Sequence, residues 1–293
     1  MMMQLADLVK AGPVVGDGAM GTMIQAAGLV GGACPDCMNL DEPDRVLMIH
    51  RAYRDAGADY LETNTFGANR LKLAPHGLES KMEEIILRGV ELAREAARDT
   101  CLVAGSVGPT GRILEPYGDT PRDQIFRSFA EEAQMMDRAG IDFFLVETMT
   151  DISEATAALE AIRSVSARPV VATAVFAAGA RGYRTVMGTA AREAARTLAE
   201  AGAIFVGTNC SNGMADALGI MKAMREGSAA AIVAQPNAGL PRVEAGRPVY
   251  PETPAAMAAG VGALLEAGVR VIGGCCGTTP DHIRAIAAAV RAH

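Results

Sequence analysis

Short apolar segments alternate with longer amphipathic segments along the whole chain. Eight continuous apolar runs occur at residues 13–19, 59–65, 101–108, 142–150, 168–176, 204–210, 230–237 and 269–276. Each run is apolar throughout and does not alternate with polar residues, as expected of strands that are buried on both faces of a parallel sheet. Between the runs, residues 44–57, 82–99 and 152–165 carry apolar positions three and four residues apart, a spacing that predicts helices.

A short Ala-Gly repeat supports this alternation of strands and helices. It stands before every second apolar run, as "AGADY", "AGIDF", "AGAIF" and "AGVRV", and its glycines are Gly57, Gly140, Gly202 and Gly268. A glycine at this place can take the left-handed conformation that ends a helix. Eight strands that alternate with eight helices predict an α/β fold, a (β/α)8 TIM barrel, as a single domain over residues 1–293.

An open, doubly wound parallel sheet is the alternative fold. Such a sheet would carry a phosphate-binding G-x-G-x-x-G turn after its first strand, and "GDGAMG" at residues 16–21 has that glycine spacing. Asp17 lies inside this turn, where its negative charge would oppose a bound phosphate. We therefore prefer the barrel.

The composition excludes some classes of partner. The formal net charge is −7, whereas nucleic-acid binding needs clustered Lys and Arg, so we expect no nucleic-acid partner. No apolar run approaches the roughly 20 residues that cross a bilayer, and the amino terminus does not resemble a signal peptide. We expect a cytoplasmic protein with no membrane partner, whose six cysteines stay reduced.

Polar and metal-binding residue types follow nearly every apolar run. The carboxyl ends of barrel strands form the active face of this fold. In chain order these ends carry Asp17, Glu62 to Thr65, Ser106 to Gly108, Glu147 and Thr148, Thr208 to Cys210, Gln235 to Asn237, and Cys275 with Cys276. We interpret this rim as the functional site.

Three cysteines at this rim predict a zinc site. Neighbouring cysteines such as Cys275 and Cys276 are a poor disulfide pair, but two thiolates directed at one centre are good zinc ligands. Cys210 ends the sixth run and the pair ends the eighth, so the barrel can bring all three together over its mouth. The alternative is three independent buried cysteines, which are common in protein cores.

The ligand type indicates the chemistry. Hydrolytic zinc sites favour His and carboxylate ligands, and none of the histidines, at positions 50, 76, 282 and 293, ends a strand. A zinc held by three thiolates, with its fourth position open, is suited to binding an incoming thiol and removing its proton. The bound sulfur stays nucleophilic, so the pattern predicts alkylation of a thiol.

At these residues the sequence resembles the homocysteine S-methyltransferase family. This family includes betaine–homocysteine methyltransferase and the homocysteine-binding module of cobalamin-dependent methionine synthase, and the wording of the motifs is closer to the latter. The matching stretches are "GDGAMGTM" (16–23), "ETNTFGAN" (62–69), "GSVGPTG" (105–111), "ETMTD" (147–151), "GTNCSNG" (207–213), "QPNAG" (235–239) and "GGCCGTTPDHI" (273–283).

The resemblance implies roles for individual residues. It implies Zn²⁺ on Cys210, Cys275 and Cys276, the three cysteines that also catalyse by activating the thiol of homocysteine for methylation to methionine. Asp17 and Glu147 would hold the substrate's α-ammonium group, and backbone N–H groups around Gly18 and Ala19 would take its carboxylate. Asn237 would be the fourth zinc ligand before substrate arrives.

Two departures from the family bear on the prediction. Cys34 and Cys37 form a C-x-x-C where many relatives have other residues, and we interpret it as a loop variant that is neither a redox site nor a second metal site. Folate, cobalamin and activation domains like those of methionine synthase do not accompany the barrel sequence. We therefore expect a separate methyl donor, either a methylcobalamin-bearing (corrinoid) partner protein or a small molecule such as S-methylmethionine, S-adenosylmethionine or a betaine.

Two other functions stay open. The chain could be one subunit of a split corrinoid-dependent methyltransferase system that uses another thiol acceptor. It could also be a thiol- or zinc-binding module without catalysis of its own, although the complete rim of carboxylates and cysteines argues against this.

Overall fold

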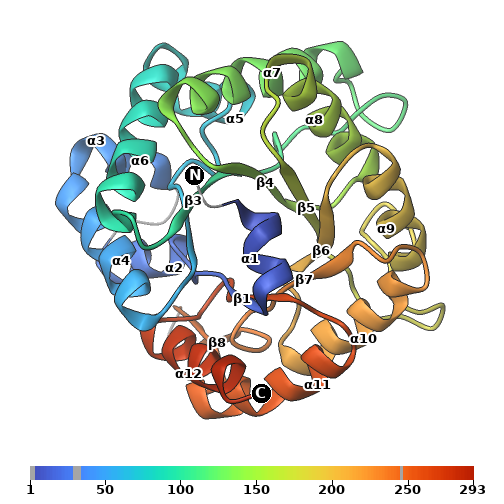
Figure 1. The fold of residues 1–293 in the computed structure, drawn as a ribbon. Helices are drawn as coiled ribbons and strands as arrows, with labels where there is room; N and C mark the ends of the chain where they lie inside the picture. The colour runs from blue at the N-terminus through green and yellow to red at the C-terminus, as the bar shows by residue number, and fades with distance from the viewer. Residues whose placement is uncertain (1–3, 29–33, 245–246) are drawn as a thin grey trace.

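Eight parallel strands alternate with eight long helices, and the helices surround the strands (Figure 1). The structure is a computed structural model that describes residues 4–28, 34–244 and 247–293. The strands are β1 (Val14–Val15), β2 (Tyr60–Glu62), β3 (Leu102–Val107), β4 (Phe143–Met149), β5 (Val170–Ala174), β6 (Phe205–Asn209), β7 (Ala231–Gln235) and β10 (Val271–Ile272). The outer helices are α4 (Pro43–Ala56), α6 (Met82–Ala97), α7 (Arg122–Ala139), α8 (Ile152–Val165), α9 (Ala191–Glu200), α10 (Met214–Arg225), α11 (Pro254–Glu266) and α12 (Pro280–Arg291).

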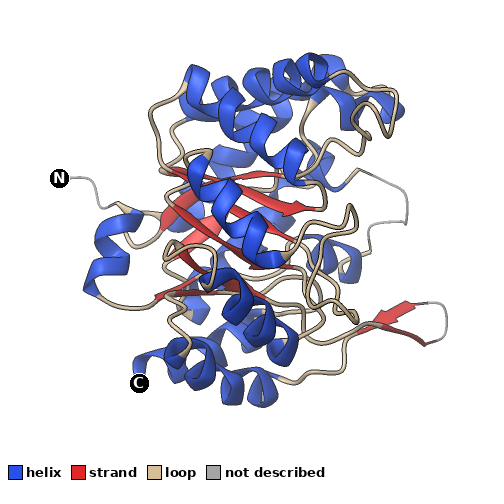
Figure 2. Cartoon of the chain, turned by 90° about the vertical axis from the view of Figure 1, so that its right-hand side faces the viewer, coloured by secondary structure: helices blue, strands red, loops and turns tan. Residues whose placement is uncertain are grey.

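The remaining elements are short and lie outside this alternation. They are α1 (Leu5–Ala11), α2 (Gly21–Ala26), η1 (Pro35–Cys37), α3 (Met38–Asp41), α5 (Arg70–Leu73), η2 (Ala74–His76), η3 (Glu79–Lys81) and the strand pair β8 (Arg242–Glu244) and β9 (Arg247–Val249). The short antiparallel β8–β9 hairpin projects from the side of the barrel opposite α1 (Figure 2).

The eight parallel strands form one sheet that curls into a nearly closed barrel. Their order is β1-β10-β7-β6-β5-β4-β3-β2, so the first two strands of the chain lie at the two edges. These edges meet through Asp59, whose N–H donates to the Val15 carbonyl and whose carboxylate accepts from the Val15 N–H, both at 2.7 Å. The predicted (β/α)8 TIM barrel is confirmed, and the open doubly wound sheet is excluded.

The glycines of the Ala-Gly repeat end helices as predicted. Gly57, Gly140, Gly202 and Gly268 have φ of 103°, 89°, 103° and 88°, all in the left-handed region that favours glycine. Each one precedes the turn into β2, β4, β6 or β10. The strands are shorter than the predicted runs, most clearly at β1 and β10, because the chain leaves the sheet and turns inward where the site residues begin.

Strand side chains alternate between two apolar clusters, which explains why the runs are apolar throughout. Val14, Leu102 and Phe143 belong to the cluster that fills the barrel, and Leu5 of α1 closes this cluster at the amino-terminal end of the strands. Their neighbours Val15 and Val103 belong to the larger cluster that the outer helices cover. Figure 1 shows α1 lying across this end of the barrel.

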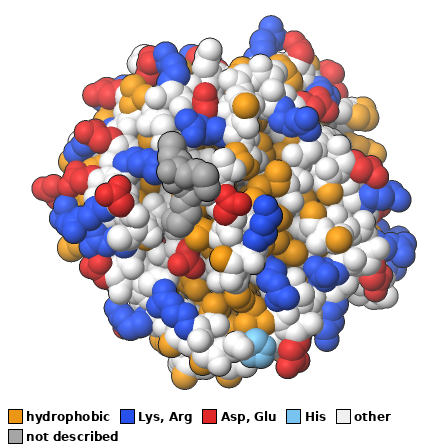
Figure 3. Space-filling view, viewed as in Figure 1, with side chains coloured by type: hydrophobic (Ala, Val, Ile, Leu, Met, Phe, Trp, Pro, Cys, Tyr) orange, Lys and Arg blue, Asp and Glu red, His pale blue; other side chains and the backbone are white. Residues whose placement is uncertain are grey.

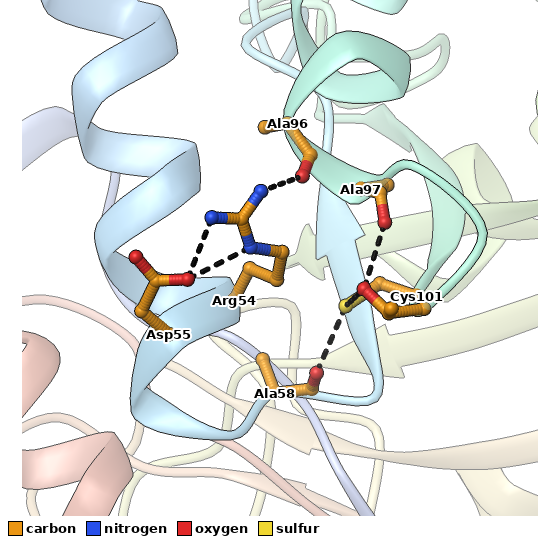
Figure 4. Close-up of polar contacts among 7 residues, drawn as sticks. Arg54, Asp55, Ala58, Ala96, Ala97 and Cys101 are labelled. Carbon is orange, nitrogen blue, oxygen red and sulfur yellow. Dashed lines mark hydrogen bonds and ion pairs between the residues drawn. The ribbon is translucent and has the colours of Figure 1, made fainter.

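Cys101 lies at the amino-terminal end of the strands, where its side chain has a structural role. Its thiol donates to the Ala58 carbonyl at 3.1 Å, which joins the start of β3 to the turn before β2 (Figure 4). Next to it, the Arg54 guanidinium donates to the Ala96 carbonyl at 2.7 Å, near the carboxyl end of α6 where a cation is favourable. Cys101 therefore lies far from the strand ends that carry the other candidate cysteines.

The surface carries charges of both signs. Figure 3 shows Lys, Arg, Asp and Glu side chains interspersed over the face that α1 covers. Among the described residues, no helix is long and apolar enough to cross a membrane.

Candidate functional site

The three predicted cysteines lie together at the carboxyl ends of the strands. Cys210 follows β6, and Cys275 and Cys276 follow β10; β7 separates these two strands in the sheet. The Cys210 and Cys276 sulfurs are 4.0 Å apart, and all three sulfurs lie within 4.8 Å of one another. They form the one group of three or more potential metal ligands among the described residues.

This arrangement fits a zinc ion. A tetrahedral site with Zn–S bonds of about 2.3 Å places its sulfurs about 3.8 Å apart, close to the observed spacing. Thiolate sulfur is a soft ligand that suits zinc and does not suit Mg²⁺ or Ca²⁺. All three cysteines are half-buried, which leaves a direction from which a further ligand can approach.

Asn237 lies at the edge of the same cluster. Its Nδ2 donates to the Cys210 carbonyl at 3.4 Å, while its buried Oδ1 has no hydrogen-bond partner. A buried amide oxygen without a partner is energetically costly, so this atom suits contact with a cation or a donor. Asn237 as the tentative fourth ligand stays a prediction.

The sulfurs share charge through mutual hydrogen bonds. Bonds from Cys210 and Cys275 lower the pKa of Cys276 to about 3. Hydrogen bonds with Cys210 and Cys276, together with burial, raise the pKa of Cys275. The protein alone thus favours one thiolate supported by two thiols, and a divalent cation would be needed to hold all three as thiolates.

Three carboxyl groups converge beside the sulfurs. Asp17 follows β1, Glu62 ends β2, and Glu147 lies in β4. Burial raises the pKa of all three, and the negative charge of Glu147 further raises the pKa of Asp17 and of Glu62. Glu62 and Glu147 lie close enough for each to shift the pKa of the other.

The environment of these carboxyl groups favours a cation. One Asp17 oxygen accepts from the Glu62 N–H at 2.9 Å, and the other is buried without a partner. The Ser106 hydroxyl donates to Glu147 at 2.6 Å. Because none of the three groups has an ion pair with a described Lys or Arg, a bound ammonium group would supply the missing positive charge.

An irregularity in the sheet directs the Glu147 side chain toward Asp17 and Glu62. The pairing of β4 with β5 shifts register between Val146 and Met149. Within the shift, Thr148 has a φ of 60°, which is an outlier for a β-branched residue. Such irregular strand segments re-aim side chains next to functional sites.

A cavity of about 430 Å³ joins the carboxyl groups to the sulfurs. Gly18 and Ala19 line it, but the Ala19 N–H already donates to the Thr278 hydroxyl at 3.1 Å. The Gly18 N–H donates to no acceptor among the described residues, so of the two predicted carboxylate-binding groups it is the more accessible. Both stay predictions.

Cys34 and Cys37 lie apart from the sulfur cluster, and the residues between them line the far part of the cavity. The Cys34 thiol donates to Asp36 at 3.6 Å, and burial raises its pKa to about 12. A thiol with a raised pKa is a weak nucleophile at neutral pH.

Sequence reasoning left three residues of the site without a role. Glu62 and Asn209 both end strands, and that position was the signal available for them. Tyr250 lies on the loop before α11, where its hydroxyl lowers the pKa of Cys276 and its ring occupies the space beside Gly277. No local pattern marks Tyr250. Among the aromatic residues, Phe66 lines the cavity and Tyr117 is exposed.

The histidines are not part of the site. His50 is fully buried in α4, and burial lowers its pKa to about 4. His282 caps the start of α12, with its Nδ1 near the Thr279 N–H at 3.2 Å and its Nε2 near the Glu252 carbonyl at 2.9 Å. Both fill the packing roles expected from their helical positions.

Known proteins similar to this chain identify its family. The family described as Homocysteine S-methyltransferase matches residues 14–290. The methionine synthase of Mycobacterium tuberculosis is 34% identical over 308 residues, which cover 98% of this chain and 25% of that protein. The methionine synthase of Mycobacterium leprae is 35% identical over 298 residues, which cover 94% of this chain and 24% of that protein. The chain thus spans about a quarter of the length of these relatives.

Solved structures share the fold. The metallated form of the Escherichia coli homocysteine methyltransferase MmuM superposes with a TM-score of 0.81 at 24% identity, covering 97% of this chain and 98% of that one. At this identity the likeness concerns the fold. The match of the family along nearly the whole barrel and the identity to the curated relatives show that the chain belongs to the homocysteine S-methyltransferase family.

Proposed function

We propose that the protein binds zinc through Cys210, Cys275 and Cys276 and methylates the thiol of homocysteine to give methionine. The observation that carries the proposal is the convergence of three sulfurs within 4.8 Å beside the buried carboxyl groups of Asp17 and Glu147 and the half-buried one of Glu62. Zinc bound there would supply a centre that removes the proton of an incoming thiol at neutral pH and keeps its sulfur nucleophilic.

The residues around the cavity would orient the substrate. Asp17 and Glu147 bind the α-ammonium group of homocysteine, and the partnerless Asp17 oxygen accepts one of its N–H groups. Glu62 adds a third acceptor on the same side. The Gly18 N–H, with Ala19 beside it, faces the substrate carboxylate. Holding the amino-acid end in this way presents the sulfur to the three cysteines and lowers the entropic cost of reaction.

The methyl group transfers by in-line displacement. A bond forms between the substrate sulfur and the methyl carbon while the bond between that carbon and the donor breaks, and the donor leaves with the electron pair. No general base is required once the thiol has lost its proton. The Tyr250 hydroxyl near Cys276 lowers the pKa of that thiol and so favours its thiolate form.

One observation favours a methyl donor carried by a protein. Large apolar side chains are exposed on the loops that follow β3, β5 and β7 at the mouth of the barrel; they are Ile113, Tyr117, Val186, Met187, Leu240, Val243 and Val249. We take these exposed apolar side chains, on loops that follow three of the strands, as a candidate protein-binding surface. We infer that a corrinoid protein with a methylcobalamin group docks there, and that S-methylmethionine, S-adenosylmethionine and betaines are weaker donors.

Substitution of Cys210 tests the zinc assignment. Zinc bound per protein chain and methylation of homocysteine are measured for Cys210→Ala after gentle purification. We expect both to be lost together, because two thiolates and an amide bind zinc far less strongly than three thiolates. Cys101→Ala removes a cysteine far from the cluster and should retain zinc and activity. A Cys210→Ala protein that is active without zinc would refute the proposal.

Assays with each donor class test the donor. Zinc-loaded protein and homocysteine are incubated with a methylcobalamin-bearing protein, S-methylmethionine, S-adenosylmethionine or glycine betaine, and methionine is measured. The proposal expects the fastest methionine formation with the corrinoid protein. Turnover only with a small donor would reject the docking surface and leave the zinc assignment intact.

A further inference from the structure

The side-chain amide of Asn209 connects the carboxyl groups to the sulfurs. Its Nδ2 donates to Glu147 Oε2 at 3.0 Å and to the Thr148 hydroxyl at 2.7 Å. Its Oδ1 accepts from the Thr148 N–H at 2.8 Å and from the Thr173 hydroxyl at 2.9 Å. With only 1% of its surface exposed, Asn209 has both ends of its amide engaged by β4 and β5.

The same amide faces the sulfur cluster. Its Nδ2 lies 4.0 Å from the Cys275 sulfur, and the next residue in the chain is Cys210. Cys210 has a φ of 53°, so the backbone turns sharply between Asn209 and the sulfur ligand. A single residue thus contacts one sulfur, precedes another, and binds the carboxyl group that would hold the substrate's amino group.

Two strained residues flank this amide. Thr148 and Cys210 are both non-glycine residues at positive φ, a conformation that persists only where surrounding contacts enforce it. The Thr148 N–H donates to the Asn209 side chain, and the Thr148 hydroxyl accepts from it. These two bonds help to hold Thr148 in this conformation. Glu147, directly before Thr148, takes its direction from the same bonds.

Glu147 needs the hydrogen bond that the Asn209 Nδ2 donates to it. Three carboxyl groups share a buried space, so each needs hydrogen-bond donors to stay in place without repulsion. Glu147 receives one donor from Ser106 on Oε1 and one from Asn209 on Oε2. An aspartate at position 209 would have the same shape but would present an acceptor where Glu147 needs a donor.

We propose that Asn209 is a positioning residue that sets the direction of Glu147 and thereby selects thiol substrates that carry an α-amino group. This inference rests on the proposed function, because it takes Glu147 as a contact of the homocysteine ammonium group. It adds that amino-group recognition depends on a residue that does not touch the substrate and that is joined in the chain to a sulfur ligand.

Binding measurements on zinc-loaded protein test the inference without a methyl donor. Dissociation constants are measured by calorimetry for homocysteine and for 4-mercaptobutyrate, which has the same thiol, chain and carboxylate but lacks the amino group. We expect Asn209→Asp to weaken homocysteine binding about tenfold to a hundredfold, the range for a hydrogen bond to a charged group, and to leave 4-mercaptobutyrate binding within about threefold.

Two further variants keep the test valid if Asn209→Asp folds poorly. Thr173→Val removes only one of the bonds to the Asn209 oxygen and should weaken homocysteine binding several-fold, while Thr173→Ser, which keeps the hydroxyl, should restore it. Asn39→Asp is the matched control, because Asn39 is also a fully buried, hydrogen-bonded asparagine. It should lower stability without changing the preference for homocysteine over 4-mercaptobutyrate.

The outcomes separate the inference from the proposed function. Wild-type protein that prefers homocysteine, with an Asn209→Asp variant that keeps the same preference, would overturn the inference alone. Equal loss of binding for both thiols in the variant would also overturn it, because it would indicate general damage to the site. Wild-type protein that binds neither thiol, or both equally, would remove the proposed function and the inference with it.

Discussion

Some buried polar atoms without hydrogen-bond partners lie in the site and others lie outside it. Asp17 Oδ1, Gln235 Oε1 and Asn237 Oδ1 belong to the rim of the barrel, where a substrate or an ion can satisfy them. Both ring nitrogens of His50 are also without partners, but His50 lies in α4, outside the site. The first group is part of the proposed recognition surface, whereas the second should affect only stability.

His50 should make the protein sensitive to acid. Burial lowers its pKa from 6.5 to about 4, so the folded state resists a proton that the unfolded state accepts. Stability is fully present above pH 6.5 and falls as the pH drops toward 4, with a total loss of about 3 kcal/mol from this group. Urea unfolding across this range should show a smaller acid-induced loss for His50→Leu than for the wild type.

The comparison between variants isolates this effect from the carboxyl groups, which titrate in both proteins. His76→Leu replaces an exposed histidine and serves as the control, with the same acid-induced loss as the wild type. A His50→Leu protein whose stability falls with acid as steeply as the wild type would contradict the assignment.

Sequence position identified some of the site residues but not their partners. Cys210, Cys275 and Cys276 stand out because thiols at strand ends are suited to metal binding. Asn209 stands next to Cys210 yet gains its role from bonds to β4 and β5, which lie 36 to 62 residues away in the chain. A single sequence offers no signal for such long-range hydrogen bonds.

Glycines allow helices to end sharply and neighbouring strands to approach closely. Gly140 ends α7 in a left-handed conformation, which the repeated Ala-Gly pattern predicted. Gly207 in β6 has a different reason: a Cβ atom there would lie 1.9 Å from the Val233 carbonyl oxygen of β7. The pairing of these strands shifts register beside it, between Val206 and Gly207, two residues before Asn209.

Gly207→Ala should therefore damage both the sheet and the proposed metal site. The methyl group would push β6 from β7, at a cost of roughly 1–3 kcal/mol, and would displace Cys210 at the end of the strand. Unfolding in urea and zinc content are measured together, and we expect both to decrease.

Gly21→Ala is the matched control. An added Cβ at Gly21 meets nothing within 4 Å, and Gly21 begins the short helix α2, where alanine is favourable. This variant should keep the stability and zinc content of the wild type. Equal behaviour of the two variants would show that the crossing of β6 and β7 has room for a side chain.

At the scale of the whole molecule, the sulfur cluster ties together distant parts of the chain. Its ligands follow β6 and β10, with β7 between them in the sheet, and β10 also pairs with β1 next to the barrel closure. A metal ion bound there would connect strands close to the two edges that Asp59 and Asp17 join by hydrogen bonds.

Removal of zinc should lower the thermal stability of the whole barrel. A ligand that binds only the folded state adds about 4 kcal/mol when its free concentration is a thousand times its Kd. Calorimetric Tm values are compared with zinc and with a chelator, and we expect a decrease of several degrees with the chelator. Cys210→Ala should show no such difference, and a Tm of the wild type that is independent of zinc would argue against a bound ion.

The sequence by itself determined the period of strands and helices, the helix ends and the three cysteines proposed to bind zinc, because these depend on local conformation and residue chemistry. The tertiary structure decided how those residues meet. Barrel closure brings Asp17 to Glu62, and the register shift in β4 turns Glu147 toward them. These positions depend on strand pairing over the whole sheet, which no local segment of the chain encodes.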